Sequence, residues 1–374
     1  MKRFLLIPDK FKGSLSASVV ISTIHSGIKK VISNAEIENI WAADGGDGFL
    51  EAIQKYDAVS TIKTPTVNPL GQKIVAPYLF EENTKTAYIE LAKASGIVLL
   101  KEPERNPLKT STFGTGIQIK HAIELGAKHV FIGLGGSATN DGGCGIASAL
   151  GYSFLNKNGS EIVPTGEDLN QIEQIKRTKT FDDVKFYAVN DVSNPLYGIK
   201  GAAYVYAQQK GANATEIALL DTNLRTLDKI VQKELDKSYA LIPGSGAAGG
   251  TAYGLKTFFD AQFLSGIDFI LRKAKVSKLL QKNTFDYIIT GEGKIDSQTL
   301  NGKLISGVVE EGKKHKIPVV AFCGKLELSK KEYQQFGISE IIEIRQPNQN
   351  QKYNMDNASK LLEQSVSEFC SHLI

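Results

Sequence analysis

Both ends of the chain alternate short apolar runs with charged, glycine-rich loops and amphipathic helices, a pattern typical of βα units. An apolar run at 4–7 ends at Pro8, and the loop DKFKGSL separates it from Ser16, which is suited to cap a helix. Beyond this cap, apolar residues recur on one helical face at Val20, Ile24, Ile28 and Val31. A second strand is expected at 37–42, followed by the loop ADGGDG and a helix at 49–55.

The alternation returns after residue 284, where the apolar run at 286–289 precedes the sequence TGEGKIDSQT. The elements expected beyond it are a helix at 304–314, a strand at 318–322, a helix at 330–336, a strand at 340–344 and a helix at 356–370. Because a single hydrophobic core stops growing at about 250–300 residues, the chain is expected to form two domains. We therefore expect a discontinuous, doubly wound α/β domain at 1–64 and 285–374, with a second α/β domain inserted at 65–284.

The doubly wound arrangement predicts where three loops meet. In a parallel sheet of order 2-1-3-4-5, the first strand lies between the second and the third, and ligands bind beyond the carboxyl ends of the strands. The loops that follow these three strands are DKFKGSL, ADGGDG and TGEGKIDSQT. We therefore expect Lys12, Ser14, Asp44 and Asp47 to lie beside the TGEGKIDSQT loop.

The residue types in these loops indicate phosphoryl transfer. Lysines and glycine N–H groups near helix N-termini bind anions, whereas carboxylates in the same place would repel a bare anion. Carboxylates are suited to hold Mg²⁺ against phosphate oxygens or to accept a proton from an attacking hydroxyl. Lysine, glycine and carboxylate together are the groups that phosphoryl transfer uses. For any one loop, a plain turn is an equally good interpretation.

The inserted segment combines strand-like pieces at 86–91 and 202–206 with further glycine blocks. In GLGGSATNDGGCG, Ser137 and Thr139 are candidate donors to a nucleotide phosphate. Asp141 is suited either to bind a cation or to cap the next helix. Asp191, in AVNDVSNP, is a candidate base or the centre of an Asx turn. The block PGSGAAGG at 243–250 indicates a close backbone approach.

Composition excludes several other classes of protein. The net charge of +4 arises from mixed charges and gives no reason to expect a nucleic-acid partner. No apolar run approaches the roughly 20 residues of a membrane span. The three cysteines, Cys144, Cys323 and Cys370, are far apart in sequence and suggest reduced thiols in the cytoplasm. The motifs GxxxxGK[ST], HExxH, CxxC and GxSxG are all absent from the sequence.

Sequence blocks along the whole chain resemble those of the bacterial type I glycerate kinases. PDKFKGSLSA is similar to the family's PDSFKGSLSA, and ADGGDG is similar to its ADGGEG. The further blocks, in family order, are IELAKASG, RNPLKTSTFGTG, GLGGSATNDGGCGIASALG, NDVSNPLYG, GAAYVYAQQKGA, PGSGAAGG and GEGKIDSQT. The departures are Lys10 for serine, Asp47 for glutamate, Ile117 for a frequent glutamate and Asn190 for cysteine.

The resemblance implies an ATP-dependent kinase that phosphorylates D-glycerate at its 2-hydroxyl to give 2-phosphoglycerate, with Mg²⁺. It also implies a flavodoxin-like domain into which a mixed-sheet domain similar to restriction endonucleases is inserted. Three alternatives stay open: a kinase for a related hydroxy acid such as tartronate, a non-catalytic two-lobed anion sensor, and a phosphatase or mutase that uses the same anion site. The sequence also leaves a homo-oligomer open.

Combining the loops with the resemblance gives each candidate residue a role. Asp9, Lys12 and Ser14 are expected to hold glycerate. Asp191 is the first candidate for the base, and Asp296 is the second candidate or a Mg²⁺ ligand. Lys12 and Lys294 are expected to act on the transferred phosphate. The residues expected near the nucleotide are Gly136, Ser137, Ala138, Thr139, Gly291, Glu292 and Gly293; those expected to hold Mg²⁺ are Asp44 and Asp47.

Overall fold

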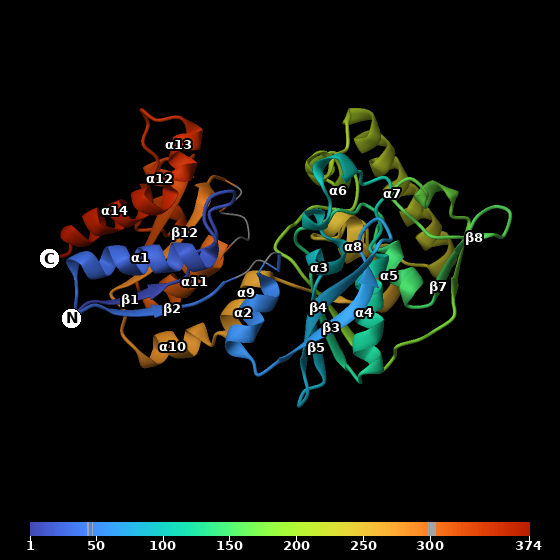
Figure 1. Cartoon of the computed structure of the whole chain (residues 1–374), viewed down its shortest axis with the longest axis horizontal. Coiled ribbons are helices and arrows are strands. Elements are labelled where there is room, and N and C mark those ends of the chain that lie inside the picture. Colours follow the sequence, from blue (N-terminus) through green and yellow to red (C-terminus); the bar gives the residue numbers. More distant parts are fainter. Residues whose placement is uncertain (43–44, 47, 298, 300–303) are drawn as a thin grey trace. The chain divides into compact units, whose positions relative to one another are not determined.

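A computed structural model gives the fold of the chain and describes residues 1–42, 45–46, 48–297, 299 and 304–374. These residues form two compact units (Figure 1). Unit 1 comprises 1–43 with 267–374, and unit 2 comprises 44–266. The chain thus leaves unit 1, builds unit 2 and returns to unit 1.

Unit 1 is built on a five-stranded parallel sheet of order β2-β1-β12-β13-β14, the 2-1-3-4-5 order expected from the sequence. Its strands are β1 Arg3–Leu6, β2 Glu36–Asn39, β12 Tyr287–Ile295, β13 Val319–Leu326 and β14 Glu340–Glu343. Its helices are α1 Ala17–Val31, α9 Gly266–Lys273, α10 Val276–Lys282, α11 Leu304–His315, α12 Lys330–Phe336, α13 Gln351–Asp356 and α14 Ala358–Ser371.

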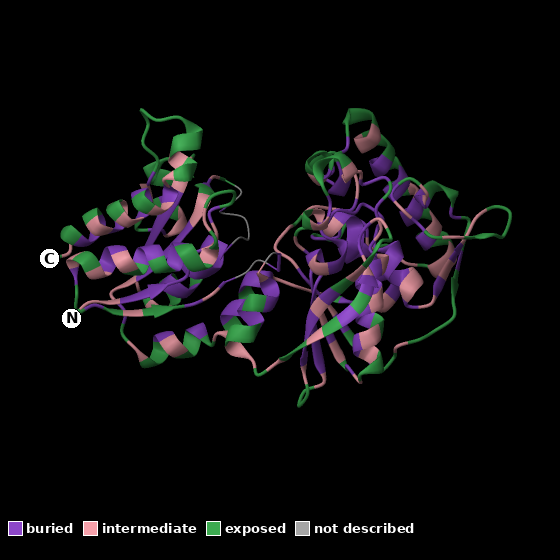
Figure 2. Cartoon of the chain, in the orientation of Figure 1, coloured by how far each residue is buried: buried purple, intermediate pink, exposed green. Residues whose placement is uncertain are grey.

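Alternation along the central strands of unit 1 divides its apolar residues between two helical layers. Ile289 and Val320 belong to the core that α1 and α14 cover. The neighbouring Ile288 and Val319 lie against Gly312 of α11 instead, because successive side chains of a strand point to opposite faces. Figure 2 shows these strands buried between helices whose outer sides are exposed. At the start of α1, Ser16 Oγ accepts from Val19 N as expected, a cap worth about 1 kcal/mol.

The third strand of unit 1 runs further than the sequence pattern predicted. The expected strand stops at residue 289, whereas β12 continues through Ile295. The extension forms because residues 291–295 pair in parallel with residues 322–326 of β13. A Cβ on Gly291 would lie 2.3 Å from Phe322 O, so a glycine is needed for this approach. Six of the ten residues of the expected TGEGKIDSQT loop, 290–295, are therefore strand. The expected last helix at 356–370 is confirmed as α14, Ala358–Ser371, and a separate short helix, α13, precedes it at Gln351–Asp356.

Unit 2 is built on a six-stranded mixed sheet of order β11-β10-β6-β5-β4-β3, with parallel pairing from β11 to β5 and antiparallel pairing beyond it. A small antiparallel sheet, β8-β7-β9, packs elsewhere in the unit. The strands are β3 Ser60–Val67, β4 Lys73–Glu81, β5 Thr86–Glu90, β6 His129–Gly133, β7 Tyr152–Leu155, β8 Glu161–Ile162, β9 Gln174–Arg177, β10 Lys185–Val189 and β11 Gln262–Leu264.

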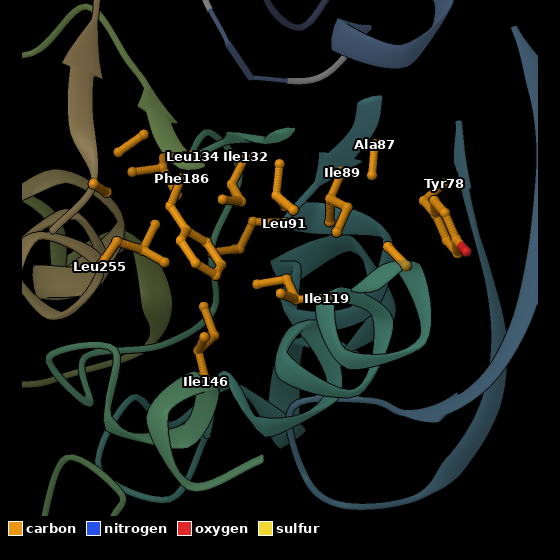
Figure 3. Close-up of a cluster of buried hydrophobic side chains, with 14 of the residues drawn as sticks. Tyr78, Ala87, Ile89, Leu91, Ile119, Ile132, Leu134, Ile146, Phe186 and Leu255 are labelled. Atoms are coloured by element: carbon orange, nitrogen blue, oxygen red, sulfur yellow. The ribbon is translucent and has the colours of Figure 1, made fainter. Parts of the chain in front are cut away.

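Helices pack around the two sheets of unit 2 and complete its core. They are α2 Phe49–Tyr56, α3 Ala92–Ser95, α4 Phe113–Glu124, α5 Cys144–Ala149, α6 Ala202–Tyr206, α7 Ala214–Leu235 and α8 Ala247–Phe259, with short 3-10 turns between them. Figure 3 shows Ile119 of α4, Ile146 of α5 and Leu255 of α8 converging on Phe186 of β10. Burying each such side chain contributes about 1.5–3 kcal/mol.

Two expectations about the inserted segment are corrected. Residues 202–206, expected as a strand, form helix α6, whose Ala202 and Ala203 are buried. Alternation over five residues does not separate a strand from a short helix, and packing against α7 and α8 decides the outcome here. The units also divide at 43/44 and 266/267, and not at the expected 64/65 and 284/285. The first boundary lies earlier because α2 packs on β4 and β5 of unit 2. The second lies earlier because α10 packs on α11 of unit 1.

Within the described residues, no helix combines the length and the hydropathy needed to cross a membrane.

Candidate functional site

The first cluster of predicted site residues lies at the carboxyl edge of the unit 1 sheet. Asp9 N donates to Gly291 O at 2.8 Å, so the loop after β1 lies directly against β12. A Cβ on Gly293 would come within 3.2 Å of Lys12 N, which places these two segments in close contact. Lys12 and Ser14 are exposed, and Asp9 is partly exposed. The structure therefore confirms that two of the three predicted loops lie side by side.

Charged side chains gather at the ends of β12 and β13. Lys294 Nζ lies 2.7 Å from Glu327 Oε2 and 3.1 Å from Asp296 Oδ2. Hydrogen bonds to Glu327 and then to Asp296 raise the pKa of Lys294, so its ammonium stays charged. Thr299 Oγ1 donates to Glu292 Oε1 at 2.5 Å, which ties the residues after β12 back onto the strand. This edge presents a charged lysine flanked by carboxylates, as phosphoryl transfer requires.

The third predicted loop, ADGGDG, falls partly outside the described residues. Asp44 and Asp47, the expected Mg²⁺ ligands, both lie outside them. Its described glycines belong to unit 2, where Gly135 N donates to Gly45 O at 3.1 Å. A Cβ on Gly135 would lie 2.1 Å from Gly46 Cα, so the two backbones are in direct contact.

The second cluster lies at the carboxyl ends of β6 and β10 in unit 2. It includes the turn at 136–139, which backbone hydrogen bonds hold on both sides. Ile97 N donates to Gly136 O at 2.9 Å, and Ala138 N donates to Ser95 O at 2.9 Å. Ala138 N therefore already donates within the protein and is not free to donate to a ligand. Thr139 Oγ1 is buried with no hydrogen-bond partner among the described residues.

A buried lysine, which the sequence analysis did not single out, supports the same turn. Lys210 Nζ donates to Ser137 Oγ at 2.8 Å and to Thr139 O at 2.7 Å. Lys210 is only 4% exposed. It lies in the YAQQKGA block, in which nothing local marks it as buried, because lysines are mostly surface residues.

Asp141 has the capping role, one of the two interpretations that its sequence context allowed. Its Oδ2 accepts from Thr112 N at 2.7 Å, Thr112 Oγ1 at 2.8 Å and Gly145 N at 3.2 Å. Its Oδ1 accepts from Gly143 N at 3.1 Å. The side chain is fully buried, and this burial raises its pKa despite the donors around it. With its oxygens occupied by protein donors, Asp141 secures the start of α5.

The Asp141→Ala variant is expected to lose at least about 3 kcal/mol in its free energy of unfolding, since several buried donors lose their acceptor. Urea denaturation followed by circular dichroism measures this loss. The exposed Asp182→Ala is the matched control and should leave stability nearly unchanged. If Mg²⁺ raises the midpoint of the unchanged protein but not that of Asp141→Ala, a cation role for Asp141 would be favoured instead.

Asp191, the first candidate for the base, lies at the end of β10 in unit 2. Its Oδ1 accepts from Ser265 Oγ at 2.8 Å and from Gly266 N at 3.0 Å, the latter at the start of α9. The Asx turn in this segment is made by Asn190, whose Oδ1 accepts from Val192 N at 3.2 Å. Asp191 therefore anchors the residues that follow β11, and one of its oxygens already has two donors.

The PGSGAAGG block makes the close backbone approach expected of it. Ala248, Gly249 and Gly250 all have left-handed backbone conformations, with φ of 53°, 66° and 87°. Gly142 N donates to Gly249 O at 3.1 Å, and a Cβ on Gly249 would lie 2.0 Å from Thr139 O. Main chain thus packs on main chain beneath the turn that Lys210 supports.

The chain is therefore a two-unit α/β protein whose candidate site residues lie in glycine-rich turns at the carboxyl ends of parallel strands. Sequence comparison then gives the family. The chain belongs to the glycerate kinase family, whose family model matches residues 4–373. It is accordingly an enzyme of the kinase class, and the alternative of a non-catalytic sensor is set aside.

Curated relatives and a solved structure match along nearly the whole chain. The chain is 38% identical over 371 residues to a glycerate kinase of Halalkalibacterium halodurans, covering 98% of this chain and 97% of the relative. It is 36% identical over 345 residues to the glycerate 2-kinase of Escherichia coli K12, covering 91% of this chain and 90% of the relative. The fold is similar to that of a protein from Salmonella typhimurium LT2 provisionally assigned as glycerate kinase 2, with a TM-score of 0.79, 32% identity and coverage of 100% and 98%.

Proposed function

We propose that the protein transfers the γ-phosphate of ATP to the 2-hydroxyl of D-glycerate, forming 2-phosphoglycerate and ADP. The observation that carries the proposal is the carboxyl edge of unit 1, where Lys294 lies between Asp296 and Glu327. Relatives named glycerate kinase and glycerate 2-kinase support the choice of acceptor.

Unit 1 receives the acceptor in this proposal. Asp9, Lys12 and Ser14 bind glycerate, with the Lys12 ammonium facing the carboxylate and Asp9 accepting from a hydroxyl. Lys12 also assists Lys294 in neutralising the charge that spreads over the transferred phosphoryl oxygens. The glycines at 291 and 293 let the backbone approach that phosphate closely.

The base is assigned to Asp296, which reverses the order of the two sequence candidates. Asp296 belongs to the same sheet edge as the residues assigned to glycerate, since Asp9 contacts Gly291 of the strand that ends just before Asp296. Asp191 Oδ1 already accepts from Ser265 and Gly266, which weakens it as a proton acceptor. The attacking hydroxyl oxygen forms the new P–O bond, its proton passes to Asp296, and the bond from phosphorus to ADP breaks.

Unit 2 receives the nucleotide in this proposal. The turn formed by Gly136, Ser137, Ala138 and Thr139 is held by hydrogen bonds from both sides, which supports a rigid phosphate-binding surface. Ser137 Oγ is its principal donor. Glu292, in unit 1, stays a candidate from the sequence for contact with ATP.

Carboxylate oxygens suit Mg²⁺, which commonly takes one or two protein carboxylates and completes its coordination with phosphates and water. Among the described residues, no group of three or more His, Cys, Asp or Glu is arranged to hold a metal. In unit 1, Glu292 is a carboxylate suited to Mg²⁺, and Asp44 and Asp47 remain candidates from the sequence. A role of Asp296 as a Mg²⁺ ligand is the alternative to its role as the base. Mg²⁺, when bound, supplies neutralisation of phosphate charge.

The fold names and the cellular location belong to the same proposal. The all-parallel 2-1-3-4-5 sheet supports a flavodoxin-like description of unit 1. The mixed six-stranded sheet of unit 2 is compatible with a restriction-endonuclease-like description. All three cysteines are buried thiols, which supports the reducing environment of the cytoplasm.

Incubation with MgATP and D-glycerate, followed by ³¹P NMR, tests the proposed reaction. A 2-phosphate ester couples to one proton and gives a doublet, whereas a 3-phosphate ester couples to two protons and gives a triplet. A doublet is expected. A triplet would contradict the assigned hydroxyl, and turnover only with tartronate or another hydroxy acid would contradict the assigned substrate.

A further inference from the structure

Lys210 is a buried cation that forms no ion pair with a carboxylate of the described residues. No carboxylate of a described residue lies within 4.0 Å of its ammonium, and its two hydrogen-bond acceptors, Ser137 Oγ and Thr139 O, are neutral. Buried lysines are normally paired with an anion, because an unpaired charge in the interior is costly. Lys210 therefore supports the turn through two hydrogen bonds while its charge is not neutralised by a nearby carboxylate of the described residues.

The surroundings place this lysine between two charge states near neutral pH. Burial lowers the pKa of Lys210 to about 7, and attraction by Asp141 opposes that shift only in part. Asp141 is the charged group that acts on it, while the backbone of Arg105 packs against the adjoining Gly211. Both the ammonium and the neutral amine are thus accessible to the folded protein.

The charge state of Lys210 decides which way the Ser137 hydroxyl proton points. An ammonium has three donors and no acceptor, so Ser137 Oγ must accept from it and the hydroxyl proton stays available to a ligand. A neutral amine can donate to Thr139 O while its lone pair accepts from the Ser137 hydroxyl. In that state the Ser137 hydroxyl donates to Lys210 and cannot donate to a ligand.

We propose that Lys210 is a positioning residue whose protonation is coupled to phosphate binding at Ser137, an inference that rests on the proposed nucleotide site in unit 2. A phosphate that accepts from the Ser137 hydroxyl favours the ammonium form of Lys210. Nucleotide binding therefore takes up a proton, and nucleotide affinity falls as the pH rises above 7, by at most about tenfold per pH unit.

Titration calorimetry with a nonhydrolysable MgATP analogue tests the coupling directly. The enthalpy is measured near pH 8.5 in two buffers of different ionisation enthalpy, so that their difference gives the number of protons exchanged. The unchanged protein is expected to take up a measurable fraction of a proton, at most one, per nucleotide. If the unchanged protein takes up no proton when it binds the nucleotide, the proposal is overturned. This outcome does not depend on the behaviour of any variant.

Two variants and a control variant test whether Lys210 is the group that takes up the proton. Lys210→Met is expected to abolish the uptake and to flatten the pH profile of the dissociation constant, a change that a purely structural role would not produce. Ser137→Ala is expected to weaken binding and also to abolish the uptake. Lys229→Met removes an exposed lysine of α7 and should leave both quantities unchanged.

The outcomes separate this proposal from the proposed function. Uptake that persists in Lys210→Met would overturn the role of Lys210 while leaving the nucleotide at this turn. An unchanged dissociation constant in Ser137→Ala would overturn both the coupling and the placement of the nucleotide. The phosphorylation of glycerate is tested separately by ³¹P NMR of the product, and neither of these results would contradict it.

Discussion

Asp296→Asn is expected to lower kcat by about 10²- to 10⁴-fold, the usual cost of losing a positioned base. An amide has nearly the shape of the carboxylate but cannot accept the hydroxyl proton during transfer. It also removes the negative partner 3.1 Å from Lys294, although Glu327 still holds that lysine at 2.7 Å. A coupled assay for ADP release at saturating MgATP and glycerate measures kcat, and circular dichroism verifies the fold.

Asp191→Asn is the matched comparison for Asp296→Asn, because it makes the same change at the competing candidate. An amide oxygen can still accept from Ser265 and Gly266, so the contacts of Asp191 Oδ1 survive the substitution. We therefore expect a smaller fall in kcat than for Asp296→Asn. A larger fall would restore Asp191 as the base, and near-normal turnover of both folded variants would contradict the assignment of either carboxylate.

Lys294→Met is expected to lower kcat by about 10²- to 10³-fold, comparable to the loss of one donor that stabilises transition-state charge. The methionine leaves Asp296 and Glu327 facing one another without the cation that lies between them. The effect should appear in kcat more than in the KM for glycerate, since the charge on the transferred phosphoryl group develops only during transfer. Steady-state kinetics with glycerate varied at saturating MgATP separates the two constants.

Two further variants show whether the effect of Lys294→Met comes from the loss of positive charge at this position. Lys294→Arg retains the positive charge and is expected to recover part of the lost activity. Lys278→Met removes an exposed lysine of α10 in the same unit and should leave kcat unchanged. A Lys294→Met enzyme with normal kcat but a raised KM for glycerate would instead assign this lysine to substrate binding alone.

The elements of unit 1 could be predicted because their signals are local. Pro8 ends an apolar run, Ser16 supplies a cap, and a 3.6-residue period marks α1. The continuation of β12 through Ile295 could not be predicted in this way, because it depends on pairing with β13 rather than on side-chain pattern. The helix at 202–206 was missed for a similar reason, since its packing partners α7 and α8 are set by tertiary structure.

The candidate site shows the same division between local and tertiary signals. The meeting of the loop after β1 with the segment after Thr290 was predictable, because parallel strands bring their carboxyl ends to one edge. Lys210 and Glu327 were not, since burial and ion pairing select them from many similar residues. The capping role of Asp141 depends on Thr112, a partner 29 residues earlier that no local pattern identifies.

The contact between the PGSGAAGG block and the 139–143 segment involves backbone atoms on both sides. A Cβ at Gly249 would lie 2.0 Å from Thr139 O, and one at Gly254, further along α8, would lie 2.3 Å from Gly142 O. No rotamer change can relieve such a collision, so neither segment can be remodelled by exchanging side chains. A substitution that adds a side chain at Gly249 or Gly254 is therefore tolerated only if the facing backbone moves as well.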